Sequence, residues 1–138
     1  HRILSCRFPC ITVSCIAALI LESIINDGYL GKNGKIIDLS RRFEEGLTKL
    51  EAQYPHAIQG PFGYRSMIAF TPFSGSKEIA LKMCHQLFKN GLIGFIAGDD
   101  PSRIRFLLPT GGLQTADIPI ALKIIEDSIQ DLENKEDI

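Results

Sequence analysis

Apolar residues recur at three- and four-residue steps near the middle of the chain and predict an amphipathic helix over residues 35–52. Charged residues occupy the opposite face, so one side of this helix would pack on a core while the other meets water. The apolar stripe comprises Ile36, Leu39, Phe43, Leu47 and Leu50.

The same spacing predicts two further helices later in the chain. One follows the turn and cap residues 73–76 and ends before Gly91, since glycine adopts the left-handed conformation that stops a helix. Its apolar stripe comprises Ile79, Ala80, Met83, Cys84, Leu87 and Phe88. The other is capped by Thr115 and tolerates Pro119 in its first turn. Its apolar stripe comprises Ile118, Leu122, Ile125, Ile129 and Leu132.

Short apolar runs between these helices predict β-strands. The predicted strands are residues 56–59, 66–71, 92–97 and 103–107. Gly60-Pro61-Phe62-Gly63 has the composition of a turn between the first two strands, and residues 98–101 have that of a turn between the last two.

The amino-terminal region is apolar and uncharged from Ile11 to Leu21, and Arg2 and Arg7 precede this run, as in a signal peptide. However, Glu22 closes the run before it reaches the roughly 20 residues that a membrane span needs. The segment then stops at Asn26-Asp27-Gly28, as a helix of a soluble domain does. We therefore expect a helix over about residues 12–26, packed on the rest of the domain.

The predicted order of elements is α-α-β-β-α-β-β-α. Short strands joined by tight turns favour a small, mainly antiparallel sheet of about four strands with helices on one face, an α/β (α+β) two-layer sandwich. The chain has 138 residues, of which 45% are hydrophobic, and shows no repeat or linker, which predicts a single domain over residues 1–138. Because the first residue is His1 and not Met, we expect a piece of a longer protein.

The net charge and the spacing of the cysteines limit the kinds of binding partner that we expect. The formal net charge is −1, so there is no overall basic character of the kind that nucleic-acid-binding proteins show. Cys6, Cys10, Cys15 and Cys84 lack a paired C-x-x-C spacing, which favours reduced thiols packed as small apolar side chains over disulfides or a metal site. We therefore expect a cytoplasmic protein that binds neither nucleic acid nor a membrane.

Motifs that carry chemistry on their own are missing from the sequence. It has no glycine-rich phosphate loop, no G-x-S-x-G nucleophile elbow and no H-E-x-x-H pair. The three histidines are scattered, and no cysteine has a base nearby in sequence. We therefore expect no metal site and no catalytic residue within this chain.

The strand at residues 103–107 holds the best candidate for a binding residue. Alternation places Ile104 and Phe106 on one face and Arg103, Arg105 and Leu107 on the other. A guanidinium held on a strand can bind a carboxylate through two parallel hydrogen bonds. A surface or interdomain salt bridge is the alternative role for Arg105.

Sequence landmarks along most of the chain point to a known family. They are Asn26-Asp27-Gly28-Tyr29-Leu30, Gly63-Tyr64-Arg65-Ser66-Met67-Ile68-Ala69-Phe70, Asn90-Gly91-Leu92-Ile93, Arg105-Phe106-Leu107-Leu108-Pro109 and Thr115-Ala116-Asp117. In this order they resemble the carboxy-terminal small domain of class III, fold-type I aminotransferases, which use pyridoxal phosphate. The chain is similar to the acetylornithine, ornithine and 4-aminobutyrate aminotransferase group.

The resemblance implies a role for Arg105 and a set of partners. In this family the matching arginine binds the carboxylate of the amino-acid or 2-oxo-acid substrate. The lysine that forms the Schiff base and most contacts to pyridoxal 5'-phosphate belong to a large domain of the same chain, and the enzymes work as homodimers. The resemblance therefore implies that this chain does not transaminate alone.

The stretch ahead of these landmarks departs from the family pattern. The family's loop before the first helix reads Ser-Thr-Phe-Gly-Gly-Asn-Pro, and its Thr reaches the cofactor phosphate. The matching stretch here is Cys6-Arg7-Phe8-Pro9-Cys10-Ile11-Thr12, in which only the Phe is kept. Arg7 stands at the position of the Thr and is a candidate contact to the phosphate. Leu108 and Gly111-Gly112 also replace the proline and the apolar residues usual there.

These observations support three hypotheses. The first is the small, substrate-closing domain of a pyridoxal-phosphate aminotransferase. The second is a degenerate aminotransferase-like domain that serves only dimerisation or interaction, which the altered loop favours. The third, a small-molecule-binding regulatory module, fits the architecture but none of the landmarks.

Overall fold

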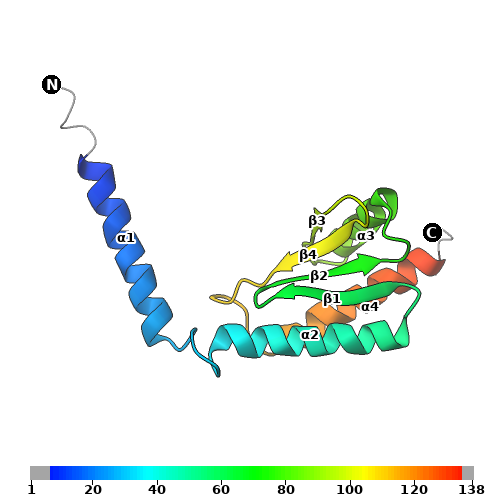
Figure 1. The fold of residues 1–138 in the computed structure, drawn as a ribbon, viewed down its shortest axis with the longest axis horizontal. Coiled ribbons are helices and arrows are strands. Elements are labelled where there is room, and N and C mark those ends of the chain that lie inside the picture. The colour runs from blue at the N-terminus through cyan, green and yellow to red at the C-terminus, as the bar shows by residue number, and fades with distance from the viewer. Residues whose placement is uncertain (1–6, 135–138) are drawn as a thin grey trace.

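The computed structural model describes residues 7–134, with side chains from Thr12 onward (Figure 1). The elements are α1 (Arg7–Asn26), α2 (Lys35–Gln53), β1 (Ile58–Tyr64), β2 (Met67–Pro72), α3 (Lys77–Lys89), β3 (Phe95–Ala97), β4 (Arg103–Leu107) and α4 (Asp117–Asn134). This is the element order predicted from the sequence.

The four strands form one sheet in the order β1-β2-β4-β3, and each neighbouring pair is antiparallel. Helices α2, α3 and α4 cover one face of this sheet (Figure 1). Among residues 7–134, no helix lies on the other face. The predicted two-layer sandwich with helices on one face is thereby confirmed.

The core lies between the sheet and these three helices. Ile68 and Phe70 of β2 and Ile104 and Phe106 of β4 are buried, which confirms the alternation predicted for residues 103–107. The Phe106 ring meets Phe43 of α2 edge-on, with centroids 5.6 Å apart, and stacks on Phe70 at 6.0 Å. Burial of such side chains stabilises the fold by about 2 kcal/mol each.

The hairpin between β1 and β2 differs from the prediction. Residues 60–63 are part of β1, and the turn lies at Arg65-Ser66, where Arg65 has φ 54°. The register shifts between Gln59 and Phe62, so Gly60 and Pro61 form a β-bulge, and Phe62 and Gly63 pair with β2. Pro61 is accommodated because β1 is an edge strand, where a missing N–H need not break a ladder.

Helix boundaries differ from the predictions by a few residues. Helix α1 begins at Arg7 and not near residue 12, with Pro9 in its first turn, where no intrahelical N–H is required. Helix α4 begins at Asp117, because residues 115–116 form a turn and the Asp117 carboxylate accepts a hydrogen bond from the Gln114 N–H at 2.7 Å. Strand β3 begins at Phe95, three residues later than expected.

Helix α1 does not pack on the sandwich, and this expectation was wrong. It extends away from the two layers (Figure 1), and Val13, Leu19 and Ile25 keep about two-thirds of their surface exposed, at 65%, 65% and 68%. The physical reason is that α2, α3 and α4 already cover the apolar face of the sheet. Among residues 7–134, none of the helices has the length and hydropathy that a membrane span requires.

Candidate functional site

The face of the sheet without helices carries the candidate site, and we refer to it as the open face. Its side chains alternate along each strand with those that face the helices, and all but Thr71 are at least partly exposed. They are Gln59, Phe62, Tyr64, Met67, Ala69, Thr71, Phe95, Ala97, Arg103, Arg105 and Leu107. Two are arginines and none is acidic, so within the described residues the open face has positive charge without a counter-charge.

Arg105 lies in the middle of the open face. In the strand register it stands opposite Ala69 of β2 and opposite Phe95 of β3. Its Nε atom is buried and has no hydrogen-bond partner. A buried N–H without a partner costs about 1–3 kcal/mol, so Arg105 carries a hydrogen-bond donor that the described residues leave unused. A salt bridge from Arg105 to another residue of this chain, the alternative role predicted for it, is not found among the residues that the structure describes.

Arg103 is two residues away on the same face, and sequence reasoning assigned it no role. It lies opposite Ala97 of β3, and its guanidinium carbon is 4.4 Å from the centroid of the Phe62 ring. Its Nε is also buried without a hydrogen-bond partner. The spacing of two arginines at i and i+2 on a strand was the available sequence signal. The contact with Phe62 was not predictable, because it depends on the bulge in β1.

The arginines of helix α2, unlike those of the open face, form ion pairs. Arg41 and Arg42 of α2 each bind the Asp38 carboxylate at 2.9 Å. These hydrogen bonds, that of Arg42 first, lower the pKa of Asp38 below its usual value of 3.8. Ion pairs therefore satisfy these helix arginines, whereas the arginines of the open face have none among the described residues.

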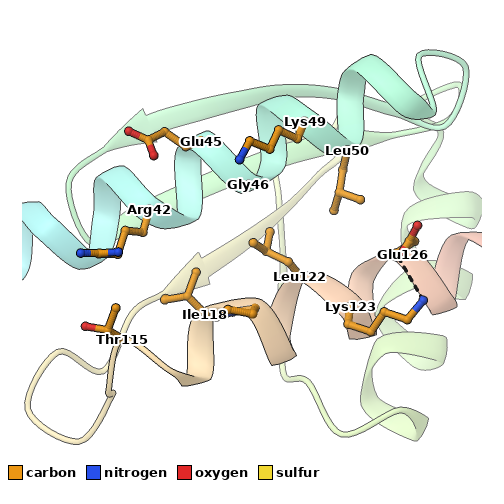
Figure 2. Close-up of a pocket in the computed structure, with 11 residues that line it drawn as sticks. Arg42, Glu45, Gly46, Lys49, Leu50, Thr115, Ile118, Leu122, Lys123 and Glu126 are labelled. Atoms are coloured by element: carbon orange, nitrogen blue, oxygen red, sulfur yellow. Dashed lines mark hydrogen bonds and ion pairs between the residues drawn. The ribbon is translucent and has the colours of Figure 1, made fainter.

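A groove between α2 and α4 is an alternative site (Figure 2). Its volume is about 430 Å³, and Gly46 allows close approach because a Cβ there would lie 2.0 Å from Leu122 Cδ1. At its rim, Lys123 binds Asp127 at 3.0 Å and Glu126 at 3.1 Å. Hydrogen bonds to Asp127 and then Glu126 raise the pKa of Lys123, so the amine stays protonated and is a poor nucleophile. The residues that line the groove pack against one another, and we find no candidate nucleophile or general base among them.

The remaining sequence candidates are placed as follows. Arg7 begins α1, and its side chain lies outside those described, so its contact to a phosphate stays a prediction. Cys84 is half-buried, and burial raises the pKa of its thiol, whereas Cys15 is exposed. The side chains of Cys6 and Cys10 lie outside the described residues. No group of His, Cys, Asp and Glu in the described part of the chain could hold a metal ion.

Comparison with solved structures identifies proteins of the same fold. A lysine aminotransferase from M. tuberculosis superposes with a TM-score of 0.72 and 23% identity over 85% of this chain and 25% of its own. An acetylornithine aminotransferase from Elizabethkingia anophelis gives a TM-score of 0.69 and 21% identity over 86% of this chain and 30% of its own. A transaminase with L-alanine gives a TM-score of 0.74 and 14% identity, over 88% of this chain and 29% of its own.

The chain therefore spans less than a third of the length of these solved proteins. The similarity that its sequence landmarks indicated is confirmed at the level of the fold. Neither the models of protein families nor the curated protein sequences gave a match.

Proposed function

We propose that this chain is the small, substrate-closing domain of a pyridoxal-phosphate-dependent class III aminotransferase. Such an enzyme moves an amino group between an amino acid and a 2-oxo acid. The observation that carries the proposal is Arg105, whose buried Nε has no partner, on a sheet face without acidic side chains, as far as the described residues go. The fold shared with solved aminotransferases supports the same assignment.

In this proposal Arg105 binds the substrate carboxylate. Its planar fork donates two parallel N–H bonds to one carboxylate, which fixes both the position and the orientation of the substrate. Ala69 opposite it has the smallest chiral side chain and leaves room for the acid group, while Phe95 opposite it and Leu107 beside it are apolar and exposed. Such positioning lowers the activation barrier by holding the reacting group in place.

The cofactor would be held elsewhere in the parent protein. The open face has no lysine and no glycine-rich phosphate cradle, so the described residues do not fit pyridoxal phosphate by themselves. When bound, that cofactor supplies an electron sink for the amino-group chemistry. We propose that a large domain of the same chain binds it, that the parent is a cytoplasmic homodimer, and that this chain alone is inactive.

A second candidate is a degenerate domain that keeps the fold and serves dimerisation or interaction. The specific observation in its favour is the stretch Cys6–Thr12, which lacks the Thr and both glycines of the family loop. From Arg7 onward this stretch is helical. Exposed apolar side chains along α1 would then be an association surface.

The test uses the longest natural form of the protein. Titration with pyridoxal phosphate is followed by absorbance, borohydride reduction traps any lysine adduct, and turnover is assayed with amino acids. We expect a trapped lysine and an activity that Arg105→Gln lowers at least about 100-fold in kcat/KM, because a charged bidentate contact is worth about 3 kcal/mol.

Arg41→Gln is the matched control, since it removes an exposed arginine from the helical layer. It should leave kcat/KM unchanged. A well-folded protein that yields no adduct and no turnover would favour the degenerate domain instead. Full activity of Arg105→Gln would refute the carboxylate-binding role.

A further inference from the structure

A cavity at one end of the sheet has a wall of apolar residues. Its volume is about 350 Å³, and it lies where β4 ends and β3 begins. Phe43 of α2 and Phe106 of β4 belong to the buried core and form part of the wall. Leu108 and Leu113, from the segment between β4 and α4, and Ala121 of α4 are half-buried and form another part. Every described residue that lines the cavity is glycine or has a hydrocarbon side chain.

The backbone of the wall offers few hydrogen-bond donors to a ligand. The N–H groups of Gly91, Leu92, Leu108 and Leu113 all donate to backbone carbonyls of this chain, at distances between 2.8 and 3.1 Å. A hydroxyl or a charged group placed in the cavity would lose its hydrogen bonds to water without gaining others, which weakens binding by about tenfold or more. The cavity therefore selects against polar ligands.

The entrance of the cavity is apolar as well. Ile93, Phe95 and Leu107 line the cavity and keep 63%, 49% and 55% of their surface exposed. A Cβ added at Gly91, which is also part of the wall, would meet no atom within 4 Å. A ligand can therefore enter from solution past apolar side chains only.

The size of the cavity suits one small apolar molecule. Cavities of about 150 Å³ lined by Leu, Ile and Phe in other proteins stay dry and bind benzene. The cavity of this chain has more than twice that volume, at about 350 Å³. Wall atoms that face an unfilled space lack dispersion contacts, so an apolar ligand that fills it stabilises the folded chain.

We infer that this cavity is a binding site for a small uncharged molecule with an aromatic ring. The rings of Phe43 and Phe106 meet edge-on in its wall, and an aromatic ligand can extend this arrangement through edge-to-face or offset contacts. Arg105 does not line the cavity, so the inference goes beyond the proposed function and does not depend on it.

The experiment compares three probes of similar shape. Toluene, phenol and benzoate are titrated into the longest natural form of the protein, in which the methyl groups of Leu and Ile are isotope-labelled for NMR. We expect toluene to saturate one site per chain. Phenol should bind at least about tenfold more weakly, because its hydroxyl finds no partner, and benzoate should not bind. Nuclear Overhauser contacts should join toluene to the methyl groups of Leu108 and Leu113.

A substitution that fills the cavity provides the second test. Ala121→Phe adds a ring to the wall and should lower toluene affinity at least about tenfold. Ala52→Phe is the matched control, since it makes the same change at an exposed position of α2 outside the cavity, and it should leave toluene affinity unchanged. If Ala121→Phe does not fold, Ala121→Leu adds less volume, and the contacts to Leu108 and Leu113 need no variant.

Several results would overturn the inference. One is toluene affinity that Ala121→Phe or Ala121→Leu leaves unchanged, and another is a set of contacts from toluene to methyl groups elsewhere. A third is the absence of saturable toluene binding, as expected if an apolar side chain of another domain already fills the cavity. Binding of phenol or benzoate as tight as that of toluene would also overturn it. None of these results bears on carboxylate binding by Arg105, which the kinetics of Arg105→Gln test separately.

Discussion

Gly63 in the β1–β2 hairpin is the position where a single methyl group should disrupt the fold most clearly. Its φ of +118° lies where side chains are strained, and an added Cβ would stand 2.1 Å from the Met67 carbonyl oxygen. That oxygen is backbone, so it can move only if the hairpin moves. Strain of about 1 kcal/mol from the dihedral and about 2 kcal/mol from the overpacking predict a total loss of about 3 kcal/mol for Gly63→Ala.

Two other glycines separate these contributions. Gly91 has φ +96° but open space where an added methyl group would stand, so Gly91→Ala should lose only about 1 kcal/mol from the dihedral. Gly111 has neither a left-handed φ nor a neighbour within 4 Å, so Gly111→Ala should stay within about 0.5 kcal/mol of the natural chain.

The assay is urea unfolding followed by circular dichroism, with thermal unfolding as a second measurement. At about 4 °C for each kcal/mol, Gly63→Ala should melt about 12 °C lower than the natural chain. Equal losses in Gly63→Ala and Gly91→Ala would refute the contact with the Met67 carbonyl. A Gly63→Ala chain as stable as the natural one would refute the register of the hairpin, and with it the path by which Phe62 reaches Arg103.

Three further predictions concern caps, thiols and charge. Ser76→Ala should cost about 1 kcal/mol in urea unfolding, because the Ser76 hydroxyl caps α3 by accepting from the Ile79 N–H at 3.3 Å; an unchanged midpoint would contradict the cap. At pH 8, Cys84 should react with a thiol reagent more slowly than Cys15, because burial raises its pKa, and peptide mapping of the labelled sites would show the reverse order if this reasoning were wrong. Asp38→Asn should destabilise the chain slightly at pH 6 and low salt. This difference should shrink as the pH falls below 3.8, because a carboxyl whose pKa is lowered by folding contributes its full stability above the pKa of the unfolded state and loses it as the pH falls through the pKa of the folded state. A difference in the free energy of unfolding that persists at pH 2 would refute an electrostatic origin.

The helices and the faces of their strands were predictable because they depend on local periodicity. In α2, Leu39, Phe43, Leu47 and Leu50 are buried as their spacing indicated, and the alternation in β4 places Arg105 on the open face. A helix or strand repeats its own geometry, so residue order alone shows which side chains share a face.

The place of the hairpin turn and the packing of helix α1 were predicted incorrectly because neighbours in space decide them. Residues 60–63 have turn composition, yet they belong to β1, with a bulge at Gly60 and Pro61, because pairing with β2 continues to Tyr64. The apolar residues of α1 predicted a helix packed on the core, but α2, α3 and α4 already cover the apolar face of the sheet. Composition does not encode such competition between segments.

Residue order alone is therefore enough to predict the element order, the two-layer architecture and the strand that presents Arg105. The contact of the Arg103 guanidinium with the Phe62 ring, at 4.4 Å, and the burial of both arginine Nε atoms without partners among the described residues depend on how the strands pair. The reason is that periodicity is a property of one segment, whereas the register between β1, β2 and β4 sets which side chains meet, and this register comes from the packing of the whole sheet.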